Sequence, residues 1–197
     1  MTAEKEDIVE LLLDRHGRTF SGELGINLSN NTPSVLFRWL CAAILMSARI
    51  SSDNAIRATK ALSDAGWTTA EHMAESSREE RVMVLNENGY ARFDESTARM
   101  LGEDVDILLE TYGGDLRRLR EKAGQDPEDE RRLLKEFKGI GDVGADIFCR
   151  EAQLAWDELY PFADKKALAA AGKLGLPKTA SGLADLVSKK GFARPVA

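Results

Sequence analysis

Apolar residues recur at helical spacing along almost the whole chain. In the segment Glu4–Arg15, for example, Ile8 and Leu11 fall on one side of a helix, and Phe93–Tyr112 forms a longer amphipathic segment ending at a glycine pair. No segment alternates apolar and polar residues as a half-buried strand does. The pattern therefore predicts an all-α protein, with a loop over residues 21–31 and shorter helices around 69–75, 78–86, 115–122 and after 177.

The most apolar helix is expected after Thr32-Pro33, because Thr is a good N-cap and Pro suits the first helical turn. Apolar residues from Val35 to Met46 cover most of its circumference, which predicts a buried central helix running to about Ala48. The next helix should be capped by Ser52 or Asp53.

Further helix starts are marked in the second half of the chain. Asp126 is a suitable N-cap, and Pro127 and the acidic residues after it suit the positive end of a helix. That helix should stop at Gly139, and a second one should run from Asp142 to about Trp156. Asp164 then caps a helix that reaches Gly172.

The glycines between these two helices, Gly139-Ile140-Gly141-Asp142-Val143-Gly144, match the G-x-G-x-x-G string of dinucleotide-binding proteins, and Asp164 follows at twenty residues. That fingerprint requires a preceding parallel strand, whereas residues 127–137 read as a helix. Between two helices, the glycines instead allow a very short hairpin whose central Ile140 packs into the core. The free amides of the second helix then face outward and suit a phosphate oxygen. The alternative is a plain helix–helix turn.

Composition adds modest constraints. The chain is 43% hydrophobic and 30% charged, as in a soluble protein. No signal peptide is visible at the N-terminus, and the longest apolar run, near Leu40–Met46, is shorter than the ~20 residues that cross a bilayer. We expect a cytoplasmic protein that contacts no membrane.

The net charge of −6 is unevenly distributed. From Asp164 onward there are seven Lys/Arg and two Asp/Glu, a local balance of +5, so the first 163 residues carry −11. An acidic body with a basic C-terminal segment is compatible with nucleic-acid binding through one face, or simply with a solvated tail.

Cys41 and Cys149 are the only cysteines, and each lies within an apolar helical pattern, which predicts buried free thiols. An iron–sulfur cluster needs about four thiolates. His16 and His72 stand apart from other metal-ligating residues. We therefore expect no metal site and no cofactor, apart from a monovalent cation that the hairpin carbonyls could hold.

Four stretches, taken in order, resemble the helix–hairpin–helix (HhH-GPD) DNA glycosylase superfamily, which contains endonuclease III. The resemblance spans about residues 33–172. The first stretch, Leu40–Arg49, resembles a buried helix that ends in small residues and then the wedge residue, which fills the gap left by a flipped base. The second, Asn88–Phe93, resembles a glycine turn, and the third, Phe137–Gly141, resembles the glycine hairpin. The fourth, Phe162–Asp164, resembles a short apolar pair followed by an aspartate.

The departures from the family pattern are informative. Members with lyase activity carry a Schiff-base lysine where this chain has Val143, and often an arginine where it has Asp142. The wedge position is Arg49 rather than glutamine, and the C-terminal four-cysteine cluster is missing. The resemblance thus implies a compact, endonuclease III-like branch without the iron–sulfur cluster and with doubtful lyase activity.

The resemblance implies a monofunctional base-excision-repair DNA glycosylase that hydrolyses the N-glycosidic bond of a flipped damaged or mismatched base. Asp164 falls at the catalytic position, where a carboxylate stabilises the oxocarbenium-like sugar. The same residue also suits the N-cap of the next helix, and the two roles can coexist. A catalytically silent DNA-structure binder of the same fold is the alternative, which Asp142 and Val143 keep open.

The expected partner is double-stranded DNA with a lesion or an abasic site, bound by a monomer. The expected DNA contacts are the hairpin, the wedge and the lysines after the aspartate, namely Lys138, Gly139, Ile140, Gly141, Gly144, Arg49, Lys165 and Lys166. Arg49 and the lysines could equally be solvated surface charges.

We expect two helical subdomains in a DNA glycosylase-like arrangement. Residues 30–156 would form a six-helix subdomain that contains the helix–hairpin–helix at about 127–156. Residues 1–29 and 157–197 would form the second, which carries the candidate catalytic aspartate.

Overall fold

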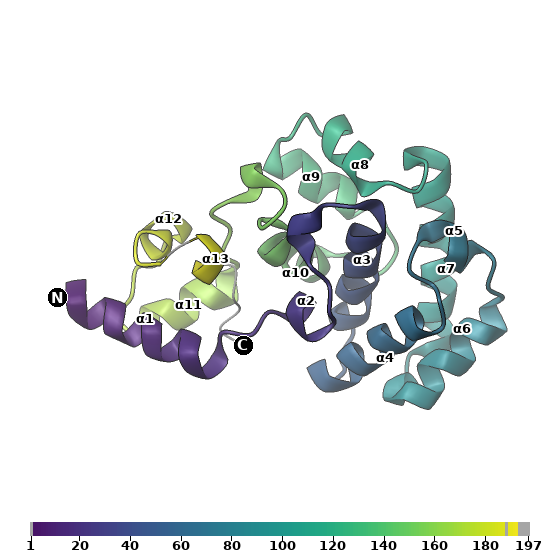
Figure 1. Ribbon diagram of the computed structural model, residues 1–197, viewed down its shortest axis with the longest axis horizontal. Coiled ribbons are helices and arrows are strands. Elements are labelled where there is room, and N and C mark those ends of the chain that lie inside the picture. The colour runs from purple at the N-terminus through teal and green to yellow at the C-terminus, as the bar shows by residue number, and fades with distance from the viewer. Residues whose placement is uncertain (1, 188, 193–197) are drawn as a thin grey trace.

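The computed structural model describes residues 2–187 and 189–192, and across these residues it contains helices and turns but no strand (Figure 1). The prediction of an all-α protein is confirmed. The α-helices are α1 (Thr2–His16), α2 (Phe20–Glu23), α3 (Pro33–Ser47), α4 (Ser52–Asp64), α5 (Ala70–Ala74), α6 (Arg78–Leu85), α7 (Asp94–Tyr112), α8 (Leu116–Lys122), α9 (Pro127–Leu134), α10 (Asp142–Ala152), α11 (Lys165–Lys173), α12 (Ala180–Ala184) and α13 (Lys189–Phe192). Shorter helical turns are η1 (Leu28–Asn30), η2 (Asn86–Tyr90) and η3 (Asp157–Leu159).

Helix α3 is the central buried helix, as its apolar circumference predicts. The Thr32 hydroxyl accepts the Val35 amide, and Pro33 occupies the first turn. Trp39 is fully buried and donates its indole N–H to the Phe148 carbonyl of α10 at 3.1 Å. The two helices lie side by side in the middle of the molecule (Figure 1), so α3 supports α10.

Several predicted boundaries are wrong. The predicted loop over 21–31 contains α2 and η1, and the cap of α4 is Ser51, whose hydroxyl accepts the Asn54 amide. Helix α9 ends at Leu134 rather than at Gly139. Beyond it the amides of Glu136 and Phe137 bond carbonyls only three residues back, since the tighter turns bring Phe137 into the core.

The end of α10 is also earlier than predicted, at Ala152 rather than Trp156. The buried Gln153 side chain donates to the carbonyls of Arg150 and Phe162 and accepts the Phe162 amide. These bonds tie the end of α10 to the segment that leads to Asp164, and the chain turns there.

The main apolar core comprises residues between Leu24 and Leu159, and the described residues of α1 and α11–α13 are outside it. The division into two subdomains remains a prediction. Cys41 and Cys149 are free and buried, as predicted. Within the described part of the chain, no helix is both long and apolar enough to cross a bilayer.

Candidate nucleic-acid interface

Helices α9 and α10 are joined by a short segment, residues 135–141, which we call the glycine loop. Gly139 has a φ of +78°, a conformation that favours glycine. A Cβ on Gly139 would lie 3.2 Å from the Ile44 Cγ2 atom and 3.3 Å from the Met100 sulfur. Ile140 is 4% exposed and packs into the core, as predicted. The loop is therefore fixed against α3 and α7 by close packing.

The N-terminus of α10 is open. Gly141 occupies the N-cap position and offers no side-chain acceptor to the first-turn amides. Among the described residues, no hydrogen bond occupies the amides of Asp142 and Val143. A Cβ on Gly141 would meet nothing within 4 Å, so the space beside this N-cap position is open. In contrast, Asp126 and Asp164 cap the first turns of α9 and α11.

Charged side chains surround this open end. Asp142 is exposed, and one of its carboxylate oxygens lies 3.0 Å from the Lys135 ammonium nitrogen. The pKa of Asp142 is lowered first by the hydrogen bond from Lys135, with smaller contributions from Arg131 and Lys165. An internal carboxylate therefore already neutralises part of the positive charge at the end of α10.

Lys165, in the first turn of α11, is among the charges that lower the pKa of Asp142, and α10 contacts the start of α11 through the Arg150–Asp164 ion pair. Lys138, Lys165 and Lys166 are all exposed. Arg49 is also exposed, just beyond α3. Its neighbour Ser47 approaches α10 closely, because a Cβ on Gly144 would lie 2.6 Å from the Ser47 hydroxyl oxygen.

Gly144 is buried between α3 and α10, and its lack of a side chain serves that packing. The predicted DNA-contact residues thus fall around the glycine loop and the starts of α10 and α11, except for the two that are buried, Ile140 and Gly144.

Asp164 is 7% exposed and has two kinds of partner. One carboxylate oxygen accepts the Ala167 amide at 2.9 Å and so caps α11, while the other pairs with the Arg150 guanidinium. Burial acts to raise the pKa of Asp164, but the Ala167 amide and Arg150 outweigh it and hold the pKa below its ordinary value. The carboxylate is therefore ionised, shielded and already paired.

Three residues of this region were not predicted from the sequence: Lys135, Arg150 and Asp104. Asp104 had a visible signal, because it occupies the apolar stripe of α7 between Leu101 and Leu108. Its Oδ1 atom accepts the Lys138 amide of the glycine loop at 2.5 Å. Lys135 and Arg150 are ordinary charged residues in sequence, and only the fold reveals their acidic partners.

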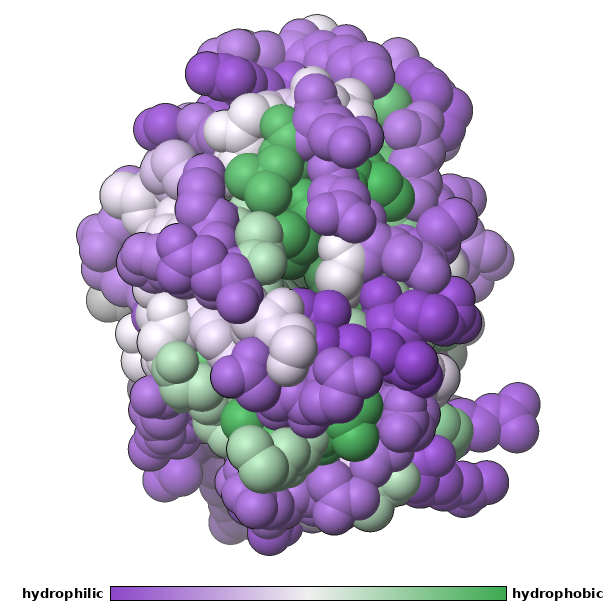
Figure 2. Space-filling model, turned by 90° about the vertical axis from the view of Figure 1, so that its right-hand side faces the viewer, coloured by the Kyte–Doolittle hydropathy of each residue, from purple (hydrophilic) through white to green (hydrophobic). Residues whose placement is uncertain are grey.

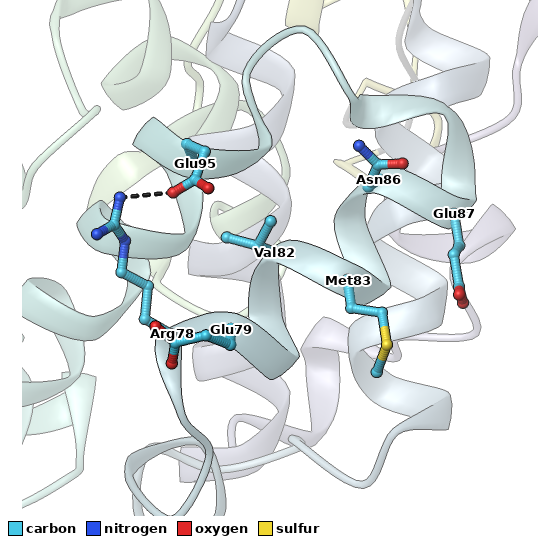
Figure 3. Close-up of a pocket in the computed structure, with 7 residues that line it drawn as sticks. All are labelled: Arg78, Glu79, Val82, Met83, Asn86, Glu87 and Glu95. Atoms are coloured by element: carbon cyan, nitrogen blue, oxygen red, sulfur yellow. Dashed lines mark hydrogen bonds and ion pairs between the residues drawn. The ribbon is translucent and has the colours of Figure 1, made fainter.

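Two hollows of the surface lie elsewhere. A groove of about 410 Å³ lies between α6 and α7, with Val82 and Met83 forming its apolar part and the Arg78–Glu95 ion pair on its side (Figure 3). The face seen in Figure 2 shows such apolar patches in a mostly hydrophilic surface. A smaller hollow of about 290 Å³ is lined by residues that include Trp67 and His72. Neither hollow includes Asp164.

Comparisons with protein-family models, with curated proteins and with solved structures each found no match to this chain. The resemblance to a superfamily therefore rests on the sequence motifs alone.

Proposed function

We propose that this protein is a DNA glycosylase of the helix–hairpin–helix superfamily, endonuclease III-like and monofunctional, which grips the DNA backbone with its glycine loop. The observation that carries the proposal is the uncapped start of α10, open at Gly141, on the same helix whose Arg150 pairs with the buried Asp164. An anion-binding end and a buried carboxylate are the two parts that such an enzyme needs.

The backbone amides at the start of α10 donate to a phosphate oxygen, and the helix dipole favours the negative charge. Lys138 and Lys165 add charge at the edge of this site. This mode of binding is local, and it is compatible with a chain whose net charge is −6. The exposed Arg49 and Lys166 would add further positive charge.

In the chemical step, the target nucleotide is extruded from the stack and its N-glycosidic bond breaks, with the electron pair leaving on the base. Positive charge builds on the sugar, and the ionised Asp164 carboxylate stabilises it. Water then bonds to the anomeric carbon and gives up a proton. Val143 is 53% exposed at the position of the lyase lysine and has no amine for a Schiff base.

A second candidate function is a DNA-structure binder without chemistry. The observation that favours it is the Arg150–Asp164 ion pair, which occupies the carboxylate within a 7% exposed residue. For catalysis this pair has to part when a nucleotide enters. In the binder the pair stays closed and serves only to hold α11 against α10.

A panel of duplexes carrying uracil, oxidised pyrimidines, 8-oxoguanine or alkylated purines distinguishes the two functions. For the enzyme, the wild type releases a free base from one of them, and Asp164→Asn abolishes release while keeping the cap of α11. Asp126→Asn is the matched control, because it alters the cap of α9 in the same way.

Tight binding to abasic duplex without release from any lesion would establish the binder instead. Separately, trapping of a covalent adduct by borohydride would refute the monofunctional assignment.

A further inference from the structure

Asp104 is a buried carboxylate directly beneath the glycine loop. It is 3% exposed, and its Oδ1 atom accepts the Lys138 amide at 2.5 Å. Its Oδ2 atom is buried and accepts no hydrogen bond from any described residue. Burying a carboxylate with only one of its two oxygens hydrogen-bonded costs free energy, so packing alone does not explain an aspartate at this position.

The surrounding contacts show that the glycine loop packs on α7. Met100, one turn before Asp104, lies where a Cβ on Gly139 would meet it at 3.3 Å. About two turns beyond Asp104, the Tyr112 ring stacks on Phe137 with ring centroids 6.3 Å apart. Between these two apolar contacts, Asp104 provides a polar one, and it is made to the loop's own backbone.

We propose that Asp104 is a positioning residue for DNA binding, which holds the glycine loop to α7 through the Lys138 amide and couples phosphate binding at the loop to the protonation of its buried carboxyl. This inference rests on the proposed function, since it assumes that the phosphate is that of DNA.

The coupling follows from the charge of the buried Asp104 carboxyl. Burial raises the pKa of Asp104 to about 7, although the Lys138 amide opposes the shift. The other titratable groups that act on or beside it are Glu103 on α7, the Lys138 ammonium on the loop and the Cys41 thiol on α3. A phosphate bound at the loop adds negative charge nearby and favours the neutral carboxyl.

Binding should therefore be accompanied by proton uptake near neutral pH. The neutral carboxyl keeps a carbonyl oxygen for the Lys138 amide, so the loop stays in place. It follows that affinity for duplex falls as pH rises from 6 to 8.

The test is fluorescence anisotropy with a labelled abasic duplex at pH 6, 7 and 8 and constant ionic strength. We expect the wild-type affinity to fall by about three- to tenfold over this range and the Asp104→Asn affinity to stay flat. Asp106→Asn removes an exposed carboxylate from the same helix and should behave like the wild type. A pH dependence retained in Asp104→Asn overturns the inference, because it would have to come from a group other than Asp104.

A second measurement on the free protein separates this inference from the proposed function. The Lys138 amide chemical shift should titrate with a midpoint near pH 7, and the titration should disappear in Asp104→Asn. A flat Lys138 amide in the wild type overturns the role of Asp104. If the amide titrates but the wild type binds no DNA at any pH, the proposed function fails while the contact between Asp104 and the loop stands.

Discussion

At the level of single residues, Asp142 is the feature that most limits the proposed grip on DNA. It is the first residue of α10, so its carboxylate lies where the helix dipole and the free amides favour an anion. It also engages Lys135, which would otherwise be available to a phosphate. A bound phosphate therefore has to compete with an internal carboxylate.

Replacing Asp142 by asparagine should accordingly strengthen binding to abasic duplex by about three- to tenfold at low salt. The gain should shrink as salt is raised, because the interactions involved are exposed. The matched control is Asp53→Asn, which removes an exposed first-turn carboxylate from α4. Unchanged or weaker binding by Asp142→Asn, measured by anisotropy, would show that no phosphate binds at the start of α10.

At the level of elements, the two glycines of the glycine loop have different roles, one in the fold and one in the proposed binding. Gly139 is required by backbone conformation and by its close approach to α3 and α7. Gly141 has a negative φ and open space in front of it, so neither strain nor packing requires a glycine there. The proposed function supplies the reason, because a side chain at that point would stand between the amides and the phosphate.

Alanine substitutions at the two glycines should therefore have opposite signatures. Gly139→Ala should lower the free energy of unfolding by about 1–3 kcal/mol, as its φ of +78° is strained for alanine. Gly141→Ala should leave thermal stability nearly unchanged and weaken duplex binding severalfold. Thermal unfolding and anisotropy on both variants check this pair, and wild-type binding by Gly141→Ala would contradict it.

The same elements show what the sequence could predict. The caps at Thr32, Asp126 and Asp164 are correctly predicted, because each depends on a side chain and amides within three residues. The ends of α9 and α10 are not, because long-range packing of Phe137 and hydrogen bonds of Gln153 set them. Which side chains form ion pairs likewise depends on residues far apart in the sequence.

Asp164 illustrates this at the site. Its position and its role as the cap of α11 could be predicted from the sequence. Its ion pair with Arg150 follows only from the packing of α11 near α10. The order of the motifs predicted that Asp164 belongs to the site, whereas its burial and its pairing with Arg150 could be seen only in the folded structure.

At the scale of the whole molecule, a second buried acid ties α8, α9 and η3 together. Glu130 of α9 is fully buried, and neither of its carboxyl oxygens accepts a hydrogen bond from a described residue. It lies beside Glu158 of η3, which in turn pairs with Arg120 of α8. Burial first, and the Glu158 carboxylate second, raise the pKa of Glu130, so the folded state keeps this group protonated.

Because the folded protein binds this proton more tightly than the unfolded chain does, stability falls as pH rises above the ordinary glutamate pKa near 4.5. Glu130→Gln mimics the protonated form, so it should stay within about 0.5 kcal/mol of the wild type near pH 4.5 and become progressively more stable than the wild type as pH rises. Glu128→Gln, on the exposed side of α9, is the control. Denaturant unfolding across pH 5–9 checks this, and parallel curves for wild type and Glu130→Gln would contradict it.

The most direct test of the account is an amide NMR titration of the intact protein with a short duplex carrying an abasic site. The account predicts that the largest shifts fall on the loop and the start of α10, at Gly139, Gly141, Asp142 and Val143, with smaller ones at Lys165. Shifts centred on the groove between α6 and α7, or no shifts at all, would contradict the claim that the glycine loop binds the DNA backbone.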